Sequence, residues 1–484
     1  MTSHPVLTGS DRESYGSLRR RSTPRAERYR IGRSLRRTAP RSTLASWASA
    51  LRRVDPIDLV EATNAGRVTE LVPLRIQRMS ASPHAFLRGA AALHAADFAV
   101  LPATGIRPVI CGDAHLGNFG FYASPERELV FDLNDFDEAH PGAWEWDLRR
   151  LVASTWTAGR DSGASEQQCE EAVRRCVRSY AEHLKQLAEQ PLLGRSFDVM
   201  DVDTLRSDTG HAKTRRAIDK AAERARTRTS DRALPRFVTG SAESGGERRI
   251  VTEPPLITHP DDEHTERIMA ALDGYLETLP PHWARILGGY HAVDVAHKVV
   301  GVGSVGLRAY LVLCEGSSPD DVLFLQLKQA RRSVVAPYVH GTEAWHAHQG
   351  QRVVEYQQAL QTVSDPLLGW TTIPSRTHGV QQFYVRQFRD MKGAIVPDRL
   401  DGPALADYAA VCGQLLAKGH ARTSGASMIA GYLGGGGRVA DALCAFARVY
   451  ADQTEADHDA LLRAIRSGRL SDRTPGQVPG GAIG

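Results

Sequence analysis

The sequence of 484 residues predicts an α+β fold with two lobes, because helix-like and strand-like patterns occupy different stretches of the chain. Helix-like periodicity dominates the early part of the chain and returns near its C-terminal end. Three strand-like runs lie between these helical regions, at 290–300, 308–314 and 322–329, separated by Gly-rich or polar turns. We therefore expect a helical lobe built from two separated stretches of chain and a β-rich lobe between them.

Shifts in composition divide the chain into five segments. Residues 1–54 are predicted to form a mostly disordered, Arg-rich arm. Residues 55–194 form the first part of the helical lobe, and 195–285 a helical insertion with a flexible connection. The β-rich lobe covers 286–395, and 396–484 supply the second part of the helical lobe.

Composition excludes several classes of protein. The chain is 42% hydrophobic and 24% charged, close to the average for globular proteins. It has no apolar run near the roughly 18 residues that a membrane span needs, so no membrane partner is expected. Its six cysteines include no CxxC pair, which argues against a disulfide scaffold or a structural zinc site and favours a reducing cytoplasm.

The N-terminal arm is strongly basic. Residues 1–53 hold 13 Arg, no Lys and three acidic residues. Such an arm could contact nucleic acid or acidic lipid through its charge; a solvated tail that reflects a GC-rich genome is the alternative. A nucleic-acid partner is expected only through this arm.

The densest chemical signal is a polar loop after a strand-like run at 107–111, followed by a second run at 128–133, an arrangement typical of a hairpin. The loop reads CGDAHLGNF and places a carboxylate, Asp113, five residues before a carboxamide, Asn118. Phosphoryl transfer needs such a pair, with the carboxylate to accept the proton of the substrate hydroxyl and the amide oxygen to hold Mg²⁺. The alternative is that these Gly, Asp and Asn residues only form a turn, since all three favour turns.

More oxygen ligands follow the second run. The sequence NDFDE supplies Asp135 and Asp137, with Asp132 just before it, and Asp147 lies at the expected start of a helix. Carboxylates of this kind suit magnesium. The spacing to Asp147 favours Asp135 over Asp132 and Asp137 as the metal ligand.

These motifs resemble those of kinase-like phosphotransferases, above all the aminoglycoside and choline kinase branch, in order, spacing and residue type as far as Leu148. The resemblance implies that Asp113 is the catalytic base, that Asn118 and Asp135 bind magnesium, and that His115 and Asp147 support the loop. The sequence departs from the family pattern at the first motif position, where Cys111 replaces the usual His.

The other half of a kinase is found downstream rather than upstream. A GVGSVG loop lies between two strand-like runs and supplies Gly301, Gly303, Ser304 and Gly306 for phosphate binding. The next run carries Lys328, one of only seven lysines in the chain. A lysine in an apolar strand is costly to bury unless an anion, such as an ATP phosphate, pairs with it; a lysine facing water from an edge strand is the alternative.

The kinase pattern also asks for a glutamate on the following helix, which would hold Lys328. Glu355 is the preferred candidate and Glu343 the alternative. The halves occur in swapped order, so we expect a bilobal, protein-kinase-like fold that is circularly permuted. The permutation predicts that Arg422, at the end of an LAKGHA helix, lies near Cys111.

Two basic residues complete the predicted site. Arg88, in a helical region before the loop, could face phosphate or substrate, and Arg386 lies near the expected connection between the lobes. An internal role, capping a helix or pairing with an acid, is the alternative for both.

The chain also resembles a bacterial family of uncharacterised conserved proteins through its GDAHLGNFG, NDFDE and KVVGVGSVG strings. That family supplies no activity, so the functional prediction comes from residue roles. We expect an ATP- and Mg²⁺-dependent phosphotransferase acting on a hydroxyl of an unidentified small molecule. A nucleotide-binding regulator without activity, a protein kinase and a metal-dependent phosphoesterase are the alternatives.

Overall fold

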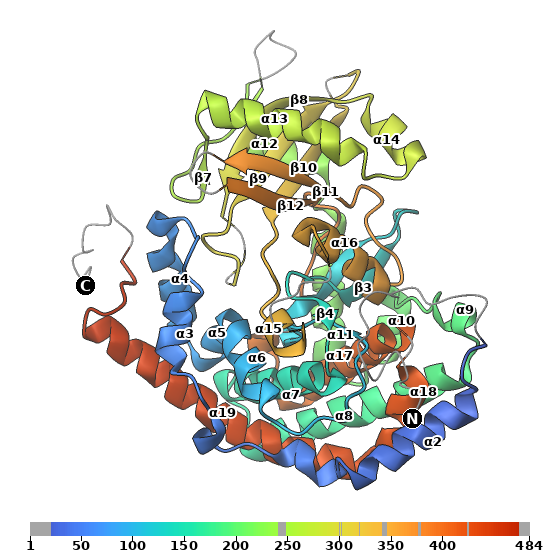
Figure 1. Cartoon of the computed structure of the whole chain (residues 1–484). Coiled ribbons are helices and arrows are strands. Elements are labelled where there is room, and N and C mark those ends of the chain that lie inside the picture. Colours follow the sequence, from blue (N-terminus) through green and yellow to red (C-terminus); the bar gives the residue numbers. More distant parts are fainter. Residues whose placement is uncertain are drawn as a thin grey trace.

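The computed structural model describes residues 21–240, 248–299, 301, 303–318, 320–340, 346–375, 379–423 and 425–473. It has mixed α+β architecture, with a six-stranded sheet above a larger helical part (Figure 1). The helical part is drawn from both ends of the described chain, and the sheet comes from the region between them. This arrangement agrees with the predicted α+β class.

The centre of the helical part is built from five helices that bury most of their apolar side chains in one core, while the C-terminal end of the last helix packs into a second one. They are α7 (Trp144–Asp161), α8 (Glu166–Glu189), α17 (Gly402–Arg422), α18 (Ala426–Leu433) and α19 (Gly437–Arg466). Ser165 and Gln168 form a capping box that fixes the start of α8. The close approach of α17 to α8 depends on Gly413, where a Cβ would lie 2.3 Å from the carbonyl oxygen of Cys176.

The six-stranded sheet is antiparallel throughout, in the order β11-β12-β10-β9-β8-β7. Its strands are β7 (Ile257–Thr258), β8 (His291–Lys298), β9 (Ala309–Glu315), β10 (Val322–Gln329), β11 (Gly369–Ser375) and β12 (Gly379–Gln387). On β10, Lys328 pairs with Ala309 of β9 and Tyr384 of β12, so it sits in the middle of the sheet. The alternative of an edge-strand lysine facing water is therefore wrong.

Further helices join these parts. The N-terminal group contains α2 (Arg25–Ser34), α3 (Pro56–Ala62), α4 (Val72–Met79), α5 (Pro83–Gly89) and α6 (Ala91–Ala99). The middle of the chain contributes α9 (Leu192–Arg195), α10 (Val202–Ser207), α11 (Ala212–Arg226), α12 (Ser230–Phe237), α13 (Asp262–Leu276), α14 (Pro281–Leu287), α15 (Ala336–His340) and α16 (Gln349–Leu360). Short strands are β1 (Val109–Ile110), β2 (Phe119–Ala123), β3 (Leu129–Leu133), β4 (His140–Pro141), β5 (Val238–Thr239) and β6 (Arg249–Ile250).

The predicted hairpin between 107–111 and 128–133 is wrong in its pairing. The run at 128–133 becomes β3 and pairs with β2, which begins immediately after the polar loop. The earlier run becomes β1 and pairs with β4. The polar loop is thus held between two small sheets rather than at the tip of one hairpin.

The prediction that residues 1–54 form a mostly disordered arm is wrong for the part that the structure describes. The helix α2 packs against α18, and the two backbones meet at Gly32, where a Cβ would lie 1.8 Å from the carbonyl oxygen of Met428. Arg36 donates from Nη2 to the carbonyl oxygen of Gly431 at 2.7 Å and from Nε to that of Tyr432 at 2.9 Å. Arginines of the arm therefore satisfy carbonyl groups at the C-terminal end of α18.

No helix within the described part of the chain is long and apolar enough to cross a membrane. All six cysteines are buried and free, so none forms a disulfide.

Candidate functional site

A polar cleft of about 360 Å³ lies where the sheet faces the helical part. It brings together most of the predicted site residues, although they come from separate stretches of chain. Those that line it are Arg88, Asp113, His115, Asn118, Asp135, Asp137, Gly301, Gly303, Ser304 and Arg386. Gly306 does not line it directly, and neither do Asp132, Asp147 and Glu355.

The polar loop is anchored by Asp147 in the first turn of α7. Its Oδ2 accepts from the backbone N–H of Cys111 at 2.6 Å, and its Oδ1 from that of Gly112 at 2.8 Å. His420 of α17 approaches the same Oδ2 with its Nε2 at 3.3 Å, and Tyr180 meets the other ring nitrogen of His420 at 2.8 Å. A buried carboxylate thus joins the loop, α7 and α17, which is the supporting position expected for Asp147.

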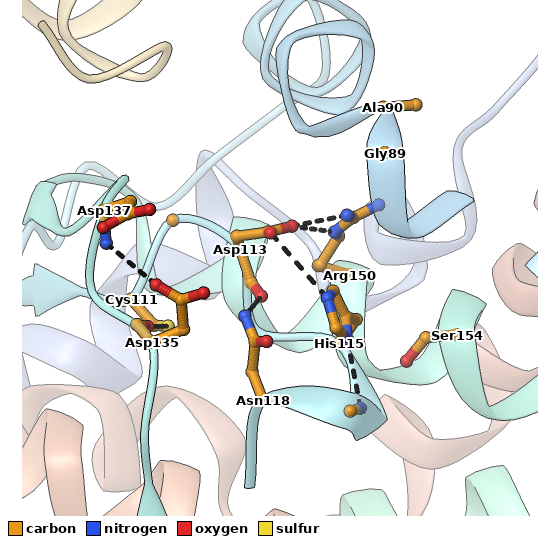
Figure 2. A network of polar contacts seen from close by, with 12 residues as sticks. Gly89, Ala90, Cys111, Asp113, His115, Asn118, Asp135, Asp137, Arg150 and Ser154 are labelled. Carbon is orange, nitrogen blue, oxygen red and sulfur yellow. Dashed lines mark hydrogen bonds and ion pairs between the residues drawn. The ribbon is translucent and has the colours of Figure 1, made fainter. Parts of the chain in front are cut away.

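Within the loop, His115 fixes the backbone. Its Nδ1 accepts from the N–H of Gly117 at 3.0 Å, and its Nε2 lies 3.8 Å from Oδ2 of Asp113 (Figure 2). Burial, together with the charge of Arg150, holds the pKa of His115 well below its usual range. The imidazole is therefore neutral and supports the turn rather than acting as a cation.

Asp113 occupies the wall of the cleft, with 21% of its side chain exposed. Its Oδ1 accepts two hydrogen bonds from Arg150 of α7, from Nε at 2.8 Å and from Nη2 (Figure 2). Burial raises the pKa of Asp113 to about 7 against the opposing charge of Arg150, and Asp135 and Glu138 raise it further. A carboxyl group that titrates near neutral pH is suited to accept a proton.

The amide of Asn118 is oriented by the same loop. Its Nδ2 donates to the carbonyl oxygen of Asp113 at 2.6 Å (Figure 2), which turns Oδ1 away from that bond as an acceptor. Asp135 follows β3 and leaves 39% of its side chain exposed on the cleft. An amide oxygen and an exposed carboxylate on one cleft are hard oxygen donors of the kind that Mg²⁺ takes.

No group of three or more His, Cys, Asp and Glu side chains placed to hold a metal occurs among the described residues. Magnesium, however, is usually held by one or two protein oxygens, with waters and substrate phosphates completing its octahedron. Asn118 and Asp135 therefore fit a magnesium ion that is bound together with a nucleotide.

The structure separates the roles of the three neighbouring aspartates. Asp132 is 2% exposed and forms a buried ion pair with Lys418 of α17. Asp137 accepts from Tyr384 at 2.9 Å and from Ser304 at 3.3 Å, and it also pairs with Lys328. Asp135 has the most exposed carboxylate of the three on the cleft, with 39% of its side chain exposed against 20% for Asp137.

Lys328 lies behind the cleft and is 4% exposed. Its Nζ is 2.5 Å from Oδ2 of Asp137 and 3.7 Å from Oδ1 of Asp135. These two carboxylates raise the pKa of Lys328 above its usual range, although burial opposes them. The sheet and the loop after β3 are thus joined by a buried ammonium group.

The predicted ion pair between Lys328 and Glu355 is wrong. Glu355 of α16 accepts from Gln351 at 2.8 Å, and its Oε2 lies 2.6 Å from Nε2 of His346. Asp137, closer to Lys328, takes the position that the pattern assigned to a glutamate. The alternative partner, Glu343, lies outside the described residues.

The glycine loop is held by the N-terminal helices. Gly301 and Gly306 have positive φ values of 59° and 83°, which favour glycine. Val68 donates from its N–H to the carbonyl oxygen of Gly306 at 2.8 Å, and Arg67 donates to that of Val305 at 2.5 Å. The segment between α3 and α4 therefore closes one end of the cleft.

Seven basic and four acidic side chains line the cleft. Among them, Arg386 stacks its guanidinium over the ring of Tyr384, with 5.6 Å to the centroid, and donates to Gln326 at 3.2 Å. Burial lowers the pKa of Lys392 to about 7, and Arg386 lowers it further. The excess of positive charge indicates an anionic ligand.

Comparison with known proteins identifies the family. A family model described as "Uncharacterized protein conserved in bacteria (DUF2252)" matches residues 67–464. The chain belongs to this DUF2252 family. No curated protein and no solved structure matches it.

The part that matches the DUF2252 model contains every residue that lines the cleft except Thr63. Sequence reasoning missed two buried arginines of this family member that fix the site. Arg150 donates to Asp113, and Arg352 donates to the loop after β3. In the sequence, both arginines lie in helices whose pattern of apolar residues looks like ordinary amphipathic periodicity. The nearby Trp-Asp-Leu sequence at 146–148 predicts the start of α7, but it does not predict that the side chain of Arg150 turns toward Asp113.

The anchoring role of Asp147 can be measured by unfolding. In Asp147→Asn, an amide nitrogen replaces one oxygen and leaves one buried N–H of the loop without an acceptor. We expect the free energy of unfolding in urea to fall by about 1–3 kcal/mol. Asp203→Asn, at an exposed position of α10, should change it by less than about 0.5 kcal/mol. Equal stability of the two variants would contradict the anchoring role.

Proposed function

We propose that this chain is an ATP- and Mg²⁺-dependent phosphotransferase that acts on a hydroxyl group of a small molecule. The observation that carries the proposal is that two segments far apart in sequence face one cleft. One is the polar loop after β1, here called the catalytic-type loop, and the other is the glycine loop with the strand that carries Lys328. Asp113 and Asn118 come from the first, and Gly301, Gly303 and Ser304 from the second.

The glycine loop and Lys328 support binding of a triphosphate. Gly301 and Gly303 expose backbone on the cleft, where N–H groups can approach phosphate oxygens. Lys328, on the strand after the loop, has the position of the lysine that pairs with the α- and β-phosphates in kinases. Asp137 forms an ion pair with this ammonium group.

Asn118 and Asp135 would hold magnesium against the phosphates. When bound, the ion neutralises charge that develops on the transferring group and its leaving oxygen. The chain orients the two donors in advance, because Asn118 is held by the carbonyl oxygen of Asp113 and Asp135 follows directly from β3.

Asp113 would accept the proton of the acceptor hydroxyl. As the hydroxyl oxygen forms a bond to the γ-phosphorus, the bond between that phosphorus and the β–γ bridging oxygen breaks and ADP leaves. The proton passes to the carboxylate of Asp113, and the acceptor leaves as a phosphate ester. Arg150 sets the direction of the carboxylate through its paired hydrogen bonds.

The order of elements supports a kinase-like fold with permuted lobes. The glycine loop joins two antiparallel strands, β8 and β9, and the lysine follows on β10. The short helix α15 and then the longer helix α16 come after β10, so strands, lysine and helix occur in the order of the kinase nucleotide lobe. Thr423, after α17, accepts from the N–H of Val109 at 3.2 Å. The helix that would precede the catalytic loop in an unpermuted kinase therefore ends beside β1, the strand before that loop. The guanidinium of Arg422 itself donates to the carbonyl oxygen of Ala359 at 3.0 Å.

One observation favours a second candidate, a nucleotide-binding protein without transferase activity. The guanidinium of Arg150 donates two hydrogen bonds to the carboxylate of Asp113. In an active enzyme, this carboxylate has to face the hydroxyl group of the substrate. Such a protein would bind ATP and Mg²⁺ and show a raised melting temperature, but it would phosphorylate nothing in a pool of metabolites.

The assignment predicts different losses at the two aspartates. Asp113→Ala should lower phosphate transfer from ATP to a metabolite pool by about 10²–10⁴-fold, with affinity for Mg²⁺–ATP nearly unchanged. Asp135→Ala should lower both transfer and Mg²⁺-dependent affinity, because it removes a metal ligand. Asp203→Ala, at an exposed position on α10, is the control. Full transfer in both folded cleft variants would reject the assignment.

The raised pKa of Asp113 predicts the pH dependence. The base acts in its ionised form, so kcat/KM should rise about tenfold per pH unit below the pKa and level off above about 7. Glu138→Gln should move this inflection to lower pH, since the negative charge of Glu138 helps to raise the pKa of Asp113. The measurement is kcat/KM from about pH 5 to 8 in steps of about 0.5 unit, for wild type and for Glu138→Gln. A kcat/KM that stays constant over this range in both proteins would exclude Asp113 as the base.

A further inference from the structure

A group of arginines on the N-terminal side of the cleft has no anionic partner. Arg88, at the end of α5, makes no hydrogen bond or ion pair with any described residue, and its Nε is buried. It lies against the catalytic-type loop, since a Cβ on Gly117 would be 3.4 Å from this Nε. An arginine held at a cleft wall without a partner indicates that a ligand completes its hydrogen bonds.

Arg75 of α4 lines the same wall and is 2% exposed. Its guanidinium donates only to neutral oxygens, to Asn64 at 2.7 Å, to the carbonyl of Gly89 at 3.1 Å and to Thr63 at 3.2 Å, while Nε has no partner in the described chain. Burial and neighbouring arginines lower its pKa to about 9. A buried cation without a counter-ion costs free energy that a bound anion would offset.

The N-terminus of α6 faces the cleft beside these arginines. Ala91 and Ala92, its first two residues, line the cleft, and no side chain caps the helix. The N–H groups of a first helical turn and the helix dipole favour anions, phosphate above all. In Figure 2, Gly89 and Ala90 lie on the side of Asp113 opposite to Asp135 and Asp137.

We propose that Arg88, Arg75 and the N-terminus of α6 form an acceptor-side anion site, so that the phosphorylated hydroxyl belongs to a molecule that already carries a phosphomonoester. This inference rests on the proposed function, in which the metal lies at Asn118 and Asp135. The glycine loop adjoins Arg88, since a Cβ on Gly303 would be 3.7 Å from the Arg88 carbonyl oxygen, so the nucleotide phosphates and the phosphate of the acceptor would lie next to each other in the cleft. The charge is suited to a dianion, because two arginines without an ion-pair partner among the described residues and a helix N-terminus line the same cleft. Arginine and a helix N-terminus together are a common pairing for phosphate.

The test uses the full chain and inorganic phosphate as the probe, titrated by calorimetry with and without a saturating, non-hydrolysable ATP analogue plus Mg²⁺. The analogue occupies the γ-phosphate position, so phosphate that still binds must use another site. We expect wild type to bind phosphate in both conditions, and Arg88→Gln to weaken phosphate affinity by about tenfold or more. Arg88→Lys should recover part of that affinity, because it keeps the charge.

Arg216→Gln, at an exposed position on α11, removes an equal charge away from the cleft and should leave phosphate affinity within about twofold of wild type. Three results would overturn the inference: no phosphate binding by wild type, equal phosphate affinity in Arg88→Gln, or displacement of phosphate by the analogue. Tighter binding of acetate than of phosphate would overturn the choice of a phosphomonoester.

Failure of the proposed function gives a different result. If wild type does not bind the analogue, the phosphotransferase assignment fails, yet phosphate binding that depends on Arg88 would still be measured without nucleotide. Conversely, analogue binding with no second phosphate site would leave the phosphotransferase proposal standing and reject the anion site.

Discussion

A buried ammonium group joins the two halves of the cleft. Lys328 is carried by the central strand of the sheet, and its partners Asp137 and Asp135 follow β3 of the helical part. Because a lone ammonium group is costly to bury, this strand can occupy its place only if the carboxylates meet it. The position of the sheet relative to the catalytic-type loop therefore depends on this ion pair.

A second cation, Arg352, also holds this junction. Arg352 of α16 donates to the carbonyl oxygens of Ala139 at 2.6 Å, Asp137 at 2.7 Å and Arg331 at 2.9 Å. The loop that presents Asp135 is thus fixed through its backbone, and its carboxylate is held at the cleft beside Lys328. A site that must bind phosphate and metal together needs this rigidity, because misplaced charges contribute little to transfer.

Local patterns predicted the local structure well. Asp147 was expected at the start of a helix and lies in the first turn of α7, because the signals for a helix start depend on near neighbours. Long-range pairing was harder. Glu355 was assigned to Lys328 because the kinase pattern requires a glutamate on the following helix, but Lys328 pairs with Asp137 instead. The strand β11 was missed because it is polar and contains a proline. The basic arm was misjudged because its arginines bind carbonyl groups of a helix almost 400 positions away.

The most direct test of the shared triphosphate site is a crystal structure of the chain with a non-hydrolysable ATP analogue and Mn²⁺ in place of Mg²⁺. The proposed function predicts an anomalous peak within about 2.2 Å of oxygens from both Asn118 and Asp135, with analogue phosphates beside Lys328 and the glycine loop. A nucleotide bound elsewhere, or a metal that touches neither residue, would contradict it.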